Sequence, residues 1–225
     1  MFGWNDLAGR GGMQAGRAMI LAGLSLVAGP AAAQPVAGEF DYYVLALSWS
    51  PAWCSQTGDA RNASQCDPGR GIDFVVHGLW PQYERGWPQD CGTDERDPSR
   101  RESQAMGDIM GSGGLAWYQW QKHGRCSGLS ARGYYQAIRD AAAVAPVPAV
   151  FDDLPRDVRV PPAVIEEAFI EANPALTRDG ITVTCKGQDL QEVRICLTRD
   201  LEPRDCGQDV RRDCSQGAVL MEQVR

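Results

Sequence analysis

The chain has 225 residues, of which 44% are hydrophobic and 23% charged, so it is long enough for one domain with a sizeable core or for two small ones. Its formal net charge is −7, and because residues 1–33 hold two arginines and one aspartate, residues 34–225 carry −8. Proteins that coat or store nucleic acid are usually basic, so this acidity argues against such a role while leaving room for a locally basic site that holds a few nucleotides.

The first 33 residues are typical of a secretory signal peptide. Two arginines precede the apolar run Met19–Val27, and Ala31–Ala33 supplies the small residues expected before a cleavage site. The apolar run is too short to span a bilayer, which favours a cleaved signal over an anchor, with a buried N-terminal helix as the alternative. We therefore predict a signal peptide over residues 1–33 and a secreted or periplasmic chain without a membrane anchor, mature from about Gln34.

The first half of the mature chain alternates apolar runs with turn-rich stretches. Residues 39–50 are mostly aromatic, aliphatic and β-branched, which predicts a buried strand. Residues 54–71 are polar, so we expect a loop that is crosslinked by its two cysteines. Residues 72–76 form a second apolar run, which predicts a central strand that ends at His77. A helix is expected over residues 99–110.

The second half favours helices and then a hairpin. Helices are predicted over residues 115–123, 132–144 and 161–172. Residues 181–184 and 190–197 are typical of two strands joined by a short turn. No internal repeat or low-complexity linker interrupts this order. The prediction is one α+β domain, in which a central, mainly antiparallel sheet is packed by several helices and stapled by disulfides.

All eight cysteines follow the predicted cleavage site. An even number of cysteines in an exported chain predicts four disulfides, although many pairings are open. Zinc binding is the alternative, but the sequence has no Cys-x-x-Cys pair and its spacings match no zinc module. Disulfides are therefore the favoured interpretation for Cys54, Cys66, Cys91, Cys126, Cys185, Cys196, Cys206 and Cys214.

Two histidines, His77 and His123, are the only ones in the sequence, and imidazole is the side chain whose ordinary pKa lies near neutrality. His77 begins the block His-Gly-Leu-Trp-Pro, and His123 follows Lys122 in the block Lys-His-Gly-Arg-Cys. Two histidines and a lysine can cleave a phosphodiester beside a 2′-hydroxyl, because one group takes the hydroxyl proton, one protonates the leaving oxygen and a cation steadies the developing charge. That chemistry would act on RNA and not on DNA.

Aromatic residues near His77 could bind nucleotides. Trp80 and Tyr83 could stack on bases, a contact that tolerates any base. Each of these residues also has an ordinary structural explanation, since lone histidines are most often packing or surface residues, Lys122 could be a solvated helix charge, and Trp80 and Trp87 could belong to the core. Composition alone leaves both interpretations open.

The two histidine blocks resemble the active-site segments of the ribonuclease T2 family. His77–Pro81 is similar to the first segment, and Lys122–Cys126 is similar to the second. Residues 40–54 resemble the first strand of that family, and residues 190–196 resemble its late strand. The resemblance therefore extends over essentially all of residues 34–225, and two ordered blocks with flanking strands are far more specific than one short motif.

This resemblance implies an α+β fold and a metal-free endoribonuclease that makes a 2′,3′-cyclic phosphate and then hydrolyses it to a 3′-phosphate. By position, His123 would be the general base and His77 the general acid of the first step, with the roles exchanged in the second, and Lys122 would stabilise the transition state. Each implied disulfide would contribute about 2–4 kcal/mol. The implied pairs are Cys54–Cys66, Cys91–Cys126, Cys185–Cys214 and Cys196–Cys206.

Four positions depart from the family pattern. The second segment commonly begins His-Glu-Trp, whereas this chain has Tyr118 and Gln119 before the tryptophan. Tyr118 can still donate a hydrogen bond to substrate, and Gln119, kept as a catalytic candidate, can donate and accept, which predicts a slower enzyme or a shifted pH optimum. Arg125 stands where threonine is usual and would add a cation near the phosphate. Gln82, a substrate-binding candidate, replaces an acidic residue that helps some members to choose a base.

The leading hypothesis is a monomeric, secreted or periplasmic ribonuclease that degrades single-stranded RNA with low base specificity and without a metal or other cofactor. Since one histidine must be neutral and the other protonated, activity is expected to favour a pH near or below about 6.5. The alternative is a catalytically weakened homologue that binds RNA or a protein partner, suggested by Tyr118 and Gln119. A metal-dependent nuclease is less favoured, because no Asp, Glu and His residues cluster at ligand spacing.

Overall fold

The computed structural model describes residues 35–152 and 154–225. The predicted signal peptide lies outside these residues. Across the two described ranges, every helix is too short or too polar to cross a membrane.

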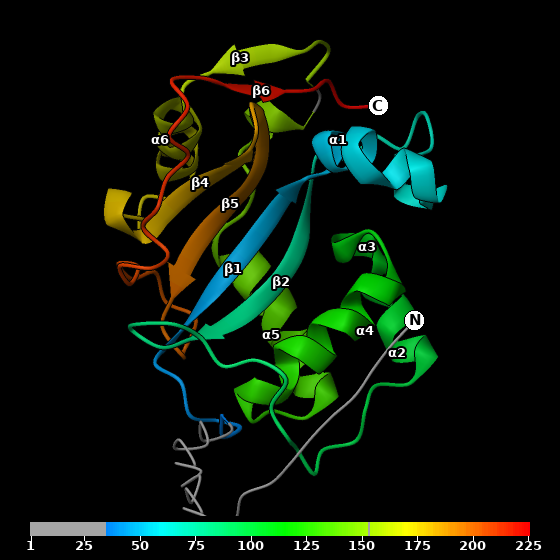
Figure 1. Cartoon of the computed structure of the whole chain (residues 1–225), viewed down its shortest axis with the longest axis vertical. Helices are drawn as coiled ribbons and strands as arrows, with labels where there is room; N and C mark the ends of the chain where they lie inside the picture. The colour runs from blue at the N-terminus through cyan, green and yellow to red at the C-terminus, as the bar shows by residue number, and fades with distance from the viewer. Residues whose placement is uncertain (1–34, 153) are drawn as a thin grey trace, which may run out of the picture. The chain divides into compact units, whose positions relative to one another are not determined.

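Strands of the described residues form one sheet, and its order is β2-β1-β5-β6-β3, with β4 paired to the other edge of β5 (Figure 1). Neighbouring strands are antiparallel except β5 and β6, which are parallel, so the predicted mainly antiparallel sheet is confirmed. The strands are β1 (Tyr42–Trp49), β2 (Phe74–Gln82), β3 (Val158–Val160), β4 (Ile181–Lys186), β5 (Asp189–Leu197) and β6 (Val219–Met221).

Serine side chains cap the N-termini of some of the α-helices. Ser112 Oγ accepts the Leu115 N–H at 3.1 Å before α4, and Ser130 Oγ accepts the Gly133 N–H at 3.2 Å before α5. The helix expected over residues 99–110 is instead two short helices, α2 and α3. The α-helices are α1 (Ser50–Trp53), α2 (Arg100–Gln104), α3 (Gly107–Met110), α4 (Gly113–Lys122), α5 (Ala131–Val144) and α6 (Pro162–Ala172).

Single helical turns occupy several connections. Residues 54–71, which were expected to form a crosslinked loop, contain three of these turns. Another turn begins just after α4. These turns are η1 (Cys54–Gly58), η2 (Asp59–Arg61), η3 (Ser64–Cys66), η4 (Gly124–Ser127), η5 (Ala149–Phe151) and η6 (Arg178–Gly180).

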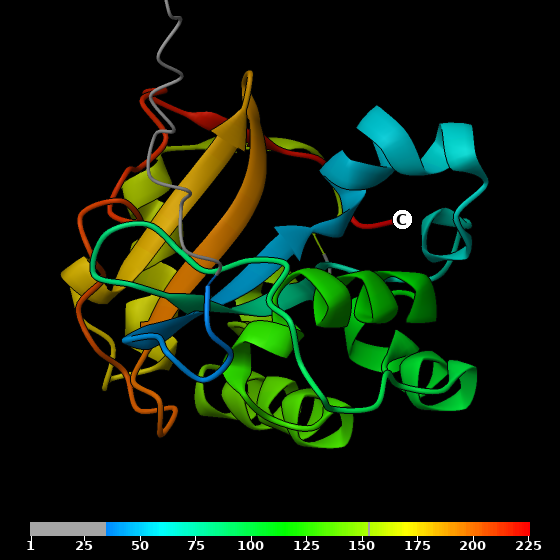
Figure 2. The same ribbon diagram turned by 60° about the horizontal axis from the view of Figure 1, so that its bottom comes forward.

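The core lies between the sheet and the helices. Helices α3, α4 and α5 pack against β2, and α6 packs against β4 (Figures 1 and 2). Alternation along β1 sends Leu45 and Trp49 into this core, where they meet Trp120 of α4, Ile138 of α5 and Phe169 of α6, all fully buried. The opposite face of β1 is therefore free to line a cavity or to pack on the C-terminal segment.

Strand β2 differs from the prediction in two respects. It continues through His77 to Gln82 instead of ending at His77, and it lies at the edge of the sheet, so the expectation of a central strand was wrong. Pro81 gives the physical reason, because proline cannot donate to a second neighbouring strand and is confined to edges. The edge position leaves β2 beside α4, which carries the other histidine.

Four disulfides crosslink the described residues, and they are the pairs that the resemblance implied. Cys54–Cys66 staples the turns after α1, and Cys91–Cys126 joins the loop after β2 to η4. Cys185–Cys214 and Cys196–Cys206 hold the C-terminal segment against β4 and β5.

Candidate active site

His77 lies at a β-bulge on the cavity face of β2. Ala46 of β1 pairs with Gly78, but the next residue, Leu47, pairs with Val76, so β2 has one extra residue at His77. Val76 belongs to the core, so alternation carries His77 to the opposite face, where it lines two cavities. The bulge then shifts the alternation by one residue, so that Leu79 returns to the core and Trp80 lines a cavity beside His77.

The C-terminal end of α4 carries His123 in a crosslinked segment. The N–H of Asp90 donates to the carbonyl of Lys122 at 2.8 Å, and the N–H of Cys126 donates to the carbonyl of His123 at 3.0 Å. The disulfide from Cys126 to Cys91 joins the same two segments. The backbone on either side of His123 is therefore fixed to the loop that follows β2.

His77, His123 and Lys122 line one cavity of about 390 Å³, which we call the catalytic cavity. Trp80 stands between the two imidazoles, with its ring centroid 5.3 Å from that of His77 and 5.4 Å from that of His123. The structure thus brings together the three residues that the sequence singled out for acid–base chemistry. Other residues that line the cavity are Gln82, Trp87, Tyr118, Gln119, Glu192 and Arg194.

Gln119 is buried beside the two histidines and is held by a hydrogen bond. Its Oε1 accepts the indole N–H of Trp80 at 2.7 Å, which leaves its amide N–H groups as donors for a ligand. Gly78 makes room for this contact, because a Cβ there would collide with Gln119 Oε1 and lie 2.5 Å from Trp80 Nε1. The glycine of the first block is therefore required by close packing.

His123 is kept uncharged by its surroundings. Its residue is 7% exposed, and burial, followed by the charges of Lys122 and His77, lowers the pKa of His123 to about 3. Its Nδ1 is buried without a hydrogen-bond partner among the described residues, so Nε2 is the ring nitrogen left for a ligand. A neutral imidazole near pH 7 suits a proton acceptor.

Two charged residues on β5, which the sequence analysis did not single out, complete the site. His77 Nδ1 donates to Glu192 Oε1 at 2.5 Å, while Glu192 Oε2 accepts from Arg194 Nε at 2.9 Å and from its terminal nitrogen at 2.7 Å. Burial raises the pKa of Glu192, but the hydrogen bond and charge of His77 and the charge of Arg194 outweigh it and lower that pKa below its ordinary value. The available signal was a carboxylate and a guanidinium two residues apart, and therefore on one face of a predicted strand.

Of four other residues that the sequence analysis singled out, two line the catalytic cavity and two do not. Tyr118 is 51% exposed and lines the catalytic cavity, and the buried Gln82 also lines it. Tyr83 packs against the hydrophobic core and lines neither cavity, so its base contact stays a prediction. The expectation that Arg125 adds a cation near the phosphate was wrong, because its guanidinium forms an ion pair with Asp97 at 2.8 Å.

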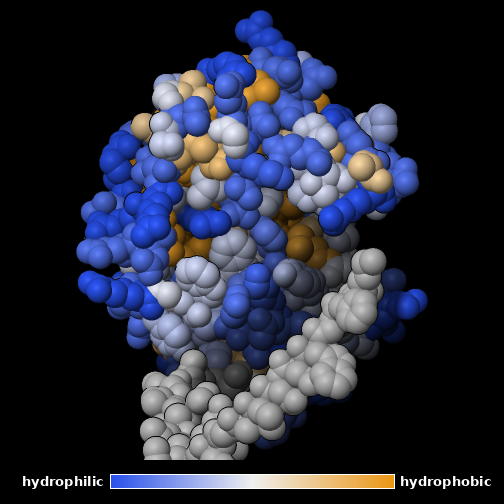
Figure 3. Space-filling model, viewed as in Figure 1, coloured by the Kyte–Doolittle hydropathy of each residue, from blue (hydrophilic) through white to orange (hydrophobic). Residues whose placement is uncertain are grey.

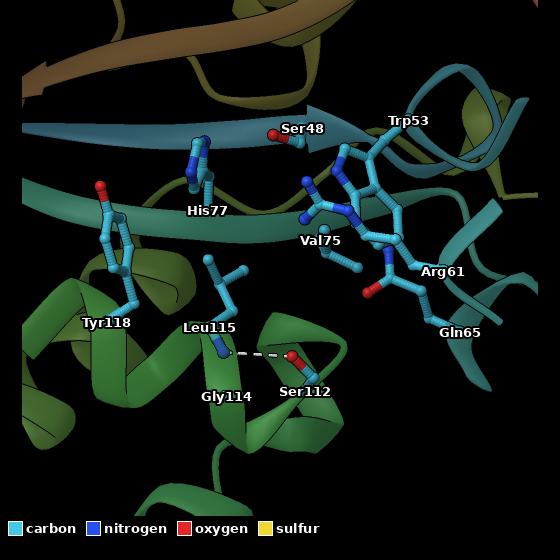
Figure 4. Close-up of a pocket in the computed structure, with 10 residues that line it drawn as sticks. All are labelled: Ser48, Trp53, Arg61, Gln65, Val75, His77, Ser112, Gly114, Leu115 and Tyr118. Carbon is cyan, nitrogen blue, oxygen red and sulfur yellow. Dashed lines mark hydrogen bonds between the residues drawn. The ribbon is translucent and has the colours of Figure 1, made fainter. Parts of the chain in front are cut away.

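A second cavity of about 490 Å³, the adjoining cavity, shares His77 and Tyr118 with the catalytic cavity (Figure 4). Figure 4 shows Arg61 and Gln65 approaching it from the turns after α1, while Tyr118 approaches from α4. Figure 3 shows the surface of the molecule from the side seen in Figure 1. This surface is largely hydrophilic, and its apolar side chains lie mainly in recessed places. Two cavities that meet at His77 suit a chain-like ligand with units on both sides of the reacting group.

The described residues offer no group of metal ligands. Within residues 35–152 and 154–225, no three or more His, Cys, Asp and Glu side chains are grouped so that they could hold a metal ion. The metal-free mechanism therefore stays a prediction for experiment.

The chain is similar to known ribonucleases in sequence and to RNase structures in fold. A ribonuclease of Aeromonas hydrophila is 45% identical over 104 residues, which are 46% of each chain, and this chain spans about half the length of the curated relatives it matches. An RNase-related protein from Calystegia sepium shares the fold, with a TM-score of 0.66, 20% identity, and coverage of 83% of this chain and 99% of that one. RNase NT in complex with 5′-AMP shows the same fold, with a TM-score of 0.56, 23% identity, and coverage of 83% and 98%. The model of the ribonuclease T2 family matches residues 40–206, and the chain belongs to that family.

Proposed function

We propose that this protein is an endoribonuclease that cleaves single-stranded RNA by acid–base catalysis without a metal ion. The observation that carries the proposal is the placement of His77, His123 and Lys122 in one cavity. Membership of the ribonuclease T2 family supports it, as do the names of its relatives. The complex of RNase NT with 5′-AMP supports nucleotide binding by this fold.

In the first step, the neutral imidazole of His123 takes the proton of the 2′-hydroxyl, and the 2′-oxygen bonds to phosphorus. The bond from phosphorus to the 5′-oxygen breaks, and His77 delivers a proton to that oxygen from Nε2. Lys122 stabilises the negative charge that builds on the phosphoryl oxygens. The products are a 2′,3′-cyclic phosphate and a 5′-hydroxyl end.

In the second step, water opens the cyclic phosphate. His77, now neutral, takes a proton from the water, whose oxygen bonds to phosphorus, and the protonated His123 returns its proton to the departing 2′-oxygen. The product is a 3′-phosphate, and both histidines return to their starting protonation states.

Low base specificity is part of the proposal. Trp80, Trp87 and Tyr118 line the catalytic cavity, and Trp87 and Tyr118 are half exposed, so they offer ring faces to any base. Gln82 donates from its amide to the neighbouring Pro81 carbonyl at 2.9 Å, which occupies part of its capacity to choose a base. We further propose that the protein is exported after removal of residues 1–33 and acts as a monomer.

The test is cleavage of single-stranded RNA by the mature protein in EDTA, with chromatography of the products and His123→Ala as the control. We expect 2′,3′-cyclic phosphates first and 3′-phosphates later, and no products from the control. If the parent does not cleave RNA, the hypothesis of an enzyme is rejected and the alternative of a catalytically weakened homologue remains. No contact among the described residues of the site favours that alternative. Cleavage that EDTA abolishes would reject the metal-free mechanism.

A further inference from the structure

Glu192 contacts His77 at the edge of the catalytic cavity. We infer that Glu192, itself held by Arg194, is a positioning residue that fixes His77 as the proton donor to the leaving oxygen. The inference rests on the proposed function, because it assigns His77 the acid role in the first step.

The geometry leaves His77 one useful nitrogen. An ionised carboxylate can only accept hydrogen bonds, so Nδ1 of His77 must carry a proton to make the 2.5 Å contact with Glu192 Oε1. Nε2 is then the ring nitrogen that can exchange a proton with substrate. After His77 has given that proton away, it remains in the Nδ1–H tautomer with a lone pair on Nε2, which is the form required to activate water in the second step.

Burying the carboxylate of Glu192 is energetically unfavourable unless both of its oxygens accept hydrogen bonds. The residue is 2% exposed, and a buried carboxylate is unfavourable without hydrogen-bonded partners. One oxygen is taken by His77, and the other is taken by Arg194 through two nitrogens. Small residues of β1, Ser48 and Ala46, stand opposite Glu192 and Arg194 and leave space for the pair.

No other carboxylate of the catalytic cavity can do the same work. Asp209 also lines the cavity, but its carboxylate accepts the backbone N–H of Gly86 at 2.6 Å. Gln119 is neutral and is bonded to Trp80. Among the described residues, Glu192 is thus the carboxylate that contacts a catalytic histidine.

Two substrates separate positioning of an acid from general damage to the site. Uridylyl-(3′,5′)-adenosine has an alkoxide leaving group that needs a proton, whereas the 4-nitrophenyl ester of uridine 3′-phosphate has one that departs without it. For Glu192→Gln we expect kcat on the dinucleotide to fall about 10-fold to 10²-fold. We expect kcat on the nitrophenyl ester and KM for both substrates to stay near those of the parent. Asp189→Asn, on the same strand but outside the catalytic cavity, is the matched control and should change neither rate.

The outcomes are distinct. Equal losses on the two substrates, or no loss on the dinucleotide, would overturn the positioning role of Glu192. A parent enzyme inactive on both substrates would instead overturn the proposed function. If Glu192→Gln does not fold, as judged by circular dichroism, Arg194→Lys decides, because it removes the two-nitrogen contact and should show the same selective loss in weaker form.

Discussion

The two histidine segments hold the same kind of side chain in opposite ways. On β2, His77 is 32% exposed and bonded to an ionised carboxylate, whereas at the end of α4 the imidazole of His123 is buried and its Nδ1 has no partner among the described residues. Burial, with the nearby cations, keeps His123 neutral, which suits a base. The carboxylate of Glu192 fixes His77 in the tautomer that an acid requires. The proposed division of the two proton-transfer roles therefore rests on the surroundings of each histidine and not on residue type.

The two segments also differ in how their backbones are fixed. His77 lies at a β-bulge in a hydrogen-bonded strand. His123 follows the last residue of α4, and the disulfide Cys91–Cys126 holds that end in place. The backbone of each histidine is thus held by a different kind of constraint.

The largest effect should come from removing either imidazole. His77→Ala and His123→Ala should each lower kcat on RNA by about 10² to 10⁴, the range of general acid–base catalysis. Initial rates with a fluorescent oligonucleotide measure the loss, and thermal melting checks the fold. Parent-like activity in either variant would remove that histidine from the mechanism.

Lys122→Met should lower kcat by about 10² to 10³, because the cation that faces the developing charge is lost. Arg125→Met is the matched control three residues along the chain. Its guanidinium is committed to Asp97, so this variant should keep its kcat and lose only a little stability. A larger loss of kcat in Arg125→Met than in Lys122→Met would reverse the assignment of the cation.

Replacing Cys91 and Cys126 together with serine should lower the free energy of unfolding by about 2–4 kcal/mol and also lower kcat, because the backbone beside His123 is released. Replacing Cys185 and Cys214 removes a crosslink that lies outside the catalytic cavity. That control should lose similar stability in urea titration at unchanged kcat. Equal kcat in the two double variants would show that the crosslink does not position His123.

Gln119→Glu should weaken the contrast between the two histidines. The new carboxylate can still accept the Trp80 N–H, and its charge favours the imidazolium, so the pKa of His123 should rise from about 3. The acid limb of the pH–rate profile should then move to higher pH. NMR resolves the titration, since the chain has only two imidazole signals to assign. An unchanged titration of His123 would contradict the electrostatic account.

The smallest effect concerns stability. The pKa of His123 is depressed in the folded protein, so between its unfolded value of 6.5 and about 3 the unfolded chain binds the extra proton, and stability falls as the pH falls through this window. His123→Leu removes this proton linkage. The difference in melting temperature, variant minus parent, should therefore increase as the pH is lowered from 6.5 to 4. A difference that stays constant with pH would mean that His123 is not titrating as proposed.

Local sequence patterns predicted most of the fold and the two histidine segments that meet in the catalytic cavity. The apolar run of β1, the hairpin of β4 and β5, and the two histidine blocks are all visible from neighbouring residues. Strand order and the bulge at His77 depend on distant pairing, which periodicity does not encode. Glu192 was not predicted for the same reason, because its partner His77 lies 115 residues away in the sequence.

Contacts formed on folding also decided which cation reaches the cavity. From its position after His123, Arg125 was expected near the phosphate, but Asp97, 28 residues earlier, captures its guanidinium. Arg194 lines the cavity instead, with its guanidinium 5.3 Å from the ring centroid of Trp80. Tertiary structure decides which carboxylate each arginine pairs with, so the position of an arginine in the sequence does not show whether its charge will reach the cavity.

The most direct test of opposite roles for the two histidines is the leaving-group dependence of His77→Ala and His123→Ala. Each variant is assayed on uridylyl-(3′,5′)-adenosine and on the 4-nitrophenyl ester of uridine 3′-phosphate. We expect His77→Ala to lose far more activity on the dinucleotide than on the ester, and His123→Ala to lose similar activity on both. The reverse pattern, or equal losses from both variants on both substrates, would rule out His77 as the acid and His123 as the base.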